Sequence, residues 1–136
     1  MKFSWKSNLM LLPVACLVSL PLASAAHAKS SEWEISTTME IPGMPFAMPP
    51  NTFRHCMDDQ GVPYQQSEDE KCETLSKKVS GNTVSWKIRC QGKEGASEMN
   101  GVTTYSGNTM ESKVSMRSDE GDVSMHMTGK KLGPCK

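Results

Sequence analysis

The chain has 136 residues, its 15 lysines and arginines are balanced by 15 aspartates and glutamates, and 37% of its residues are hydrophobic. This length fits one domain. The balanced charge and the lack of a basic patch argue against nucleic acid as a partner, and no polybasic or amphipathic stretch indicates binding to a membrane surface.

Residues 1–28 have the pattern of a secretory signal peptide. Lys2 and Lys6 give a positive start, residues 9–22 are mostly apolar, and the small residues at 23–28 match the A-x-A cleavage pattern twice. The apolar stretch of about 14 residues is short for a membrane helix, which needs about 20. We therefore predict a signal peptide that is removed, and no stable membrane span after cleavage.

The favoured cleavage site follows Ala28, with Ala25 as the alternative, and it leaves residues 29–136 as a single small β-domain. Lipoprotein processing at Cys16 is disfavoured, because Pro13 stands where that chemistry wants leucine or a similar residue. We expect an exported protein without a lipid anchor.

The exported part is so poor in leucine, isoleucine, valine and phenylalanine that it approaches the composition of disordered chains. Trp33, Trp86 and nine methionines supply further apolar volume. An even set of cysteines in a small exported domain predicts disulfides, each typically contributing about 2–4 kcal/mol. We infer that the fold depends on oxidised cysteines. The four cysteines of the set are Cys56, Cys72, Cys90 and Cys135.

In chain order, residues 32–39 alternate polar and apolar side chains, which is the period of a half-buried strand. Residues 41–51 contain four prolines, which cannot donate a backbone hydrogen bond to a sheet, so a loop or an extended connection is expected. A short strand follows at 52–57, and residues 58–71 are predicted to form a polar loop.

The clearest hairpin joins residues 73–79 to residues 83–91 through the turn Ser-Gly-Asn-Thr at 80–83. The Gly-Asn pair supplies the positive φ angles that tight hairpin turns need. Alternation along the second strand places its valine, tryptophan and isoleucine on one face.

The same four residues recur at 106–109, where they join a strand at 96–105 to one at 109–117. A final strand is expected at 123–127, followed by a tail at 129–135. The sequence therefore predicts a mostly β fold, an antiparallel meander sheet or small barrel of about six or seven strands stabilised by disulfides.

An ordered set of short segments spans nearly the whole exported part and resembles the bacterial exported family catalogued as domain of unknown function 3617. The resemblance implies a small exported protein of Gram-negative bacteria. It implies no activity and no catalytic residues, because none is assigned to the family. The segments are Trp33-Glu34-Ile35, Pro42-Gly43-Met44-Pro45, Arg54-His55-Cys56, Cys72, the 80–86 hairpin with Cys90, the 105–108 turn and the closing residues 129–135.

Four cysteines allow three pairings. Cys72 and Cys90 lie at the two open ends of the first hairpin, which favours Cys72–Cys90 with Cys56–Cys135. Alternation puts Cys90 on the Trp86 face and Cys72 on the other, a conflict that a β-bulge would repair. The pairing Cys56–Cys72 with Cys90–Cys135 stays open. A zinc site is disfavoured, since its ligands normally come in closely spaced pairs.

Methionine suggests one candidate site. Thioethers select Cu(I), and imidazole also suits copper, so Met125, His126 and Met127, or Met44 with Met48, are candidate ligands for a soft metal. On a regular strand, however, Met125 and Met127 face one way and His126 the other. Packing in a core is the commoner use of methionine, and a copper-binding protein is the alternative function.

The sequence gives little support for an enzyme. His55 and His126 are the only histidines of the exported part, no Gly-x-Ser-x-Gly segment is present, and the paired carboxylates lie among turn-forming residues. We expect a non-enzymatic protein without a cofactor.

The remaining candidate is apolar binding. Met44, Phe46 and Met48 are large apolar residues on a proline-rich segment that cannot join a sheet. The segment is expected either to cap the core, which is favoured, or to bind an unknown protein or a small apolar ligand. The predicted function is a binding or envelope-associated accessory module of the periplasm.

Overall fold

The computed structural model describes residues 30–136, so the predicted signal peptide and Cys16 lie outside the described residues. Seven strands form one antiparallel sheet in the order β2-β1-β7-β6-β5-β4-β3. The predicted mostly β, antiparallel meander is therefore confirmed. The strands are β1 (Ser30–Glu40), β2 (Asn51–Asp58), β3 (Lys71–Ser80), β4 (Thr83–Gly92), β5 (Gly95–Ser106), β6 (Thr109–Ser118) and β7 (Gly121–Pro134). Residues 30–136 contain no helix long and apolar enough to cross a membrane.

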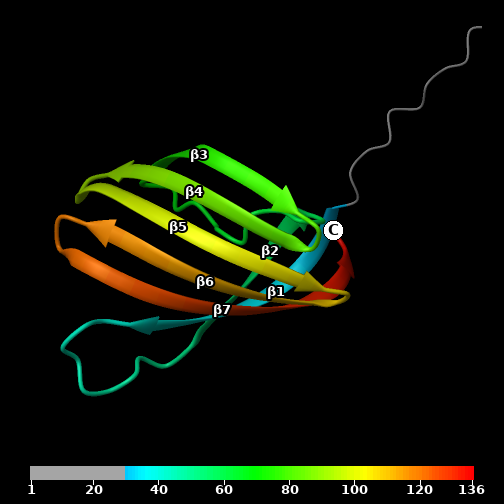
Figure 1. The fold of residues 1–136 in the computed structure, drawn as a ribbon, viewed down its shortest axis with the longest axis horizontal. Coiled ribbons are helices and arrows are strands. Elements are labelled where there is room, and N and C mark those ends of the chain that lie inside the picture. The colour runs from blue at the N-terminus through cyan, green and yellow to red at the C-terminus, as the bar shows by residue number, and fades with distance from the viewer. Residues whose placement is uncertain (1–29) are drawn as a thin grey trace, which may run out of the picture.

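The sheet curls into a half-barrel. Figure 1 shows β3 to β7 fanned side by side, with β1 and β2 behind them. Trp33 on β1 and Tyr105 on β5 are separated by two strands, yet their rings meet edge to face with centroids 5.7 Å apart. Since neighbouring strands lie about 4.8 Å apart, a flat sheet would hold the two strands far out of contact.

The core lies on the inner, concave face and extends along the half-barrel, from Trp33 and Val84 to Met99 and Cys90. Gly101 makes room for Trp86, because a Cβ at this glycine would lie 2.1 Å from the indole ring. The Trp86 indole N–H donates to Thr103 Oγ1 (3.0 Å), which is 2.8 Å from Ser112 Oγ. The aromatic side chain is thus buried without leaving its polar atom unpaired.

The connection from β2 to β3, residues 59–70, closes this end of the half-barrel. Tyr105 donates its hydroxyl proton to the carbonyl of Gly61. Gln60 donates to the carbonyl of Gly81 (2.8 Å), and Lys131 Nζ lies 2.9 Å from Asp59 Oδ1. We call residues 59–70 the crossing segment, because it joins the two outermost strands of the sheet.

The two disulfides are Cys56–Cys135 and Cys72–Cys90, with Cα atoms 5.7 Å and 4.1 Å apart. The favoured pairing is confirmed. Cys72 lies directly opposite Cys90, and the register of β3 shifts between Thr74 and Ser76. This is the irregularity that the alternation pattern required.

Two expectations are wrong. Residues 129–135 are not a tail, because β7 continues to Pro134 and pairs with β1 from Ser31 onward.

The proline-rich segment does not cap the core either. It extends away from the sheet at the lower left of Figure 1, and its apolar side chains are 41–69% exposed. They are Met44, Phe46 and Met48.

The Cys56–Cys135 bridge closes a sequence separation of 79 residues and Cys72–Cys90 one of 18. By loop-closure entropy, the paired substitution of Cys56 and Cys135 by serine should lower the free energy of unfolding by about 1 kcal/mol more than the same change at Cys72 and Cys90. Urea unfolding followed by tryptophan fluorescence measures both. Reduction of both disulfides in the wild type should lower the free energy of unfolding more than either paired substitution does. Unchanged unfolding after reduction would contradict the inferred dependence on disulfides.

Candidate functional site

A cavity of about 530 Å³ lies between the inner face of the sheet and the second half of the crossing segment. Its floor is the inner face of the sheet, where Met99, Met125 and Met127 also belong to the hydrophobic core. Its other wall is formed by residues 63–70. Apolar side chains line the bottom of the cavity, and polar side chains line its rim. The apolar lining comprises Met39, Phe53, Pro63, Tyr64, Met99, Met116, Met125 and Met127, and the polar lining comprises Thr37, Asn51, Gln65, Gln66, Ser67, Glu68, Glu70 and Ser97.

Five methionines dominate this lining because strand register gathers them on one face. Met99 on β5 is opposite Met116 on β6, and Met39 on β1 is opposite Met125 on β7. Directly opposed side chains on one face have Cβ atoms about 4.5–5.5 Å apart. Together with Met127, the two pairs form a soft, adaptable apolar wall, since methionine has three rotatable bonds and fills irregular space.

Tyr64 fixes the crossing segment over the cavity. Its hydroxyl donates to Glu70 Oε2 (2.8 Å) and lies 3.7 Å from Cys72 Sγ and 3.6 Å from Cys90 Sγ. Burial, followed by the hydrogen bond and the charge of Glu70, raises the pKa of Tyr64. The phenol therefore stays protonated, and the wall of the cavity is attached to the Cys72–Cys90 bridge.

One polar atom in the lining has no partner. Thr37 is 5% exposed, and its Oγ1 makes no hydrogen bond within the described part of the chain. A buried hydroxyl without a partner costs roughly 1–3 kcal/mol.

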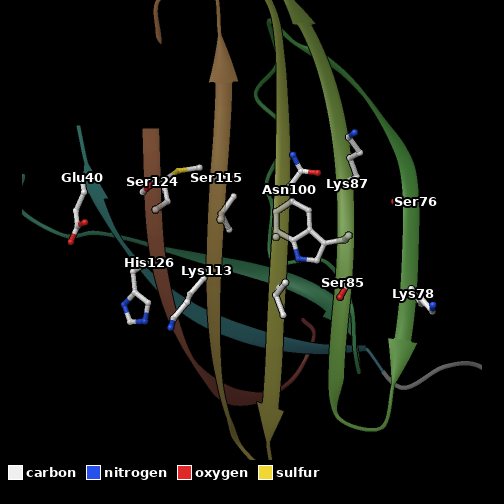
Figure 2. A pocket seen from close by; sticks show the side chains of 15 residues that line it. Glu40, Ser76, Lys78, Ser85, Lys87, Asn100, Lys113, Ser115, Ser124 and His126 are labelled. Carbon is white, nitrogen blue, oxygen red and sulfur yellow. The ribbon is translucent and has the colours of Figure 1, made fainter. Parts of the chain in front are cut away.

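A larger depression, of about 980 Å³, lies on the outer face of the sheet. Figure 2 shows Lys113 and His126 on β6 and β7, with β1 and β2 passing behind. Eight of the fifteen residues that line it are serine, asparagine or lysine, and most of these eight are exposed. His126 Nε2 is 2.9 Å from Glu111 Oε1, and this hydrogen bond lowers the pKa of the Glu111 carboxyl. The depression has the composition of an ordinary solvated sheet face.

The structure places the residues singled out from the sequence in three regions. Met125 and Met127 point into the cavity, whereas His126 lies on the outer face, so the three do not meet at one point. Met44 and Phe46 line a separate shallow depression of about 390 Å³ on the proline-rich segment. The remaining predicted residues, the four cysteines, form the two disulfides.

His55 lies on β2 opposite Trp33 and is half-buried, and this burial lowers its pKa. Within residues 30–136, one acidic and two sulfur groups also come within metal-ligand distance of one another: Glu70, Cys72 and Cys90. The two sulfurs are joined in a disulfide, so they offer no thiolate to an ion.

Sequence reasoning missed Met39, Met99, Met116 and Phe53 as cavity residues. Alternation within each strand puts each of them on a definite face, but which strands face each other across the curl depends on long-range packing. Tyr64 was also missed, since it lies in a polar loop without regular period.

The molecule is thus a small, disulfide-bridged antiparallel half-barrel with a core on its inner face and an open, apolar, ligand-sized cavity against residues 63–70. A model of the family described as "Protein of unknown function (DUF3617)" matches residues 28–135, and the chain belongs to this family. No curated protein and no solved structure matches the chain.

The two tyrosines of the chain, Tyr64 and Tyr105, both hold the crossing segment in place. Burial, and to a lesser extent the charge of Asp59, raises the pKa of Tyr105 to about 12. The unfolded chain loses these protons first, near the ordinary tyrosine pKa of roughly 10, so stability should fall as the pH rises from about 10 towards 12.

The ultraviolet absorbance of tyrosine, measured as a function of pH, tests the raised pKa values. At about pH 11, the folded protein should show little phenolate absorbance, while the chain unfolded in guanidinium should show nearly full ionisation of both tyrosines. Ordinary titration of both residues in the folded protein would mean that the crossing segment does not bury them.

Proposed function

We propose that the protein is exported to the periplasm and binds a small apolar ligand in the methionine-lined cavity, without catalysing a reaction. The single observation that carries the proposal is the cavity itself. Its volume of about 530 Å³ lies within the range of about 300–1,000 Å³ typical of small-molecule sites, which are mostly apolar with a few polar groups. The two disulfides support export, because they persist in oxidising compartments.

The proposed function does not include catalysis, because the residues that could act as nucleophile, base and orienting group do not lie close together. A nucleophile, a base and an orienting group must lie within hydrogen-bond reach of one another. In the described part of the chain, His126 hydrogen-bonds to Glu111 but to no serine. Nor does either described histidine line the apolar cavity.

Binding of the neutral fluorophore N-phenyl-1-naphthylamine tests the proposal. Ser97 lies half-buried at the rim, so Ser97→Trp should fill the cavity without removing a core side chain. We expect saturable binding by the wild type and at least about tenfold weaker binding by Ser97→Trp, a loss of about 1.4 kcal/mol. The matched control is Ser85→Trp on the exposed outer face, which should bind like the wild type.

Equal affinity in Ser97→Trp and Ser85→Trp would locate the probe elsewhere on the molecule. Failure of the wild type to bind would remove the proposal. Thermal unfolding of both variants, compared with the wild type, separates a filled cavity from a damaged fold.

A second candidate, a periplasmic soft-metal protein, is favoured by the same five methionines, since thioethers are ligands that select Cu(I). The expected ligands differ from the tripeptide read from the sequence. Met125 and Met127 face the cavity and His126 does not.

Anaerobic Cu(I) titration separates the candidates. The double variant Met125→Leu/Met127→Leu keeps most of the side-chain volume but should lose tight Cu(I) binding, while His126→Ala should keep it. No tight binding by the wild type would eliminate the metal function, and equal loss in both variants would contradict the assignment of the ligands to the inner face.

A further inference from the structure

A second depression of about 360 Å³ adjoins the apolar cavity. Ser67, Glu70, Ser97 and Met116 line both, so the two are direct neighbours. The second depression lies between the end of the crossing segment and the turns that join β4 to β5 and β6 to β7.

The two parts differ sharply in chemistry. The first is lined by methionine and aromatic side chains, and neither lysine, arginine nor histidine is among its lining residues. The second carries four carboxylates and one cation. The charged residues of the second part are Asp69, Glu70, Glu94, Glu120 and Lys93, and Glu68 stands at the rim of the first.

The single cation is already engaged. Lys93 Nζ lies 3.3 Å from Asp69 Oδ1, in a pair that is largely exposed. Glu70 accepts the hydrogen bond of Tyr64. No ion pair is seen for Glu94 or Glu120 within residues 30–136, so the depression keeps an excess of negative charge.

Thr37 lines the apolar cavity, but its Oγ1 is buried and has no hydrogen-bond partner within residues 30–136. The two adjoining depressions thus offer an apolar volume beside an acidic end.

Resting on the proposed binding function, we infer that the ligand is a cationic amphiphile, an apolar molecule bearing an ammonium group, with its apolar body in the methionine-lined cavity and its charge in the acidic depression. An ammonium group there is attracted by unpaired carboxylates. A carboxylate or phosphate head group would face the same charges, and the one cation among the lining residues, Lys93, is already paired. The site should therefore discriminate against fatty acids and anionic lipids of equal chain length.

Displacement of N-phenyl-1-naphthylamine by dodecylamine, dodecanol and dodecanoate, each below its micelle concentration, tests the inference with the apolar chain held constant. We expect affinity in the order amine, alcohol, carboxylate, with the amine at least about tenfold tighter than the carboxylate. Because the carboxylates are partly exposed, the difference should shrink in about 1 M salt, where the screening length falls to about 3 Å.

The double variant Glu94→Gln/Glu120→Gln should reduce the preference for the amine over the alcohol and leave dodecanol binding unchanged. The matched control is Glu73→Gln/Glu111→Gln, which removes the same charge from exposed positions on β3 and β6 that line neither part of the site, and should keep the preference.

The outcomes distinguish the two proposals. If the probe and all three chains bind but the amine shows no advantage, or if both double variants lose it equally, the inference fails while apolar binding stands. If neither the probe nor any of the three compounds binds, the proposed function fails and this inference fails with it.

Discussion

The crossing segment is the constraint on which the rest of the structure depends. A half-barrel leaves its first and last strands apart, so its inner face must be covered by something other than a strand. Here residues 59–70 supply the cover, held by the Tyr105 hydroxyl at one end and by Tyr64 at the other. Neither anchor is a sheet hydrogen bond, so the closure depends on buried phenols and on the disulfide beside Tyr64.

This manner of closure explains why a cavity remains beside the second half of the crossing segment. In the core, large rings fit against glycine and small hydroxyl residues, as Trp86 does over Gly101 and beside Thr103. Beside the cavity, the crossing segment consists of polar residues from Gln65 onward, which cannot fill an apolar floor. Unbranched methionines line the space instead, and such side chains can adjust to an occupant of variable shape.

Much of the fold was predictable because it is local. Period-two alternation and the two Ser-Gly-Asn-Thr turns fix the strands and the hairpins of β3 to β6. Even the bulge in β3 followed from requiring Cys72 and Cys90 to face the same side. The length of β7 was missed because Gly129 and Gly133 look like breakers. Gly129 is required where Met110 packs, since a Cβ would come within 2.6 Å of it.

The cavity could not be predicted from local sequence patterns. Its methionines come from four strands, and their meeting depends on the curl of the sheet and on the path of a loop without periodic pattern. Met125 and Met127 were noticed for their chemistry, and the alternation argument correctly separated them from His126. The carboxylates of the acidic end were noticed only as pairs among turn-forming residues, because nothing in the sequence says that those turns lie beside the cavity.

The Cys56–Cys135 bridge also gives the molecule a mechanical property. It joins β2 to the residue after β7, and the 79-residue separation that it closes contains the whole of β3 to β7. A pulling force applied between the two ends of the chain passes through the bridge, so only the part before Cys56 can be drawn out. Most of the cavity floor lies inside the covalent loop and is shielded from tension, whereas β1, with Thr37 and Met39, is the strand that such a force would remove first.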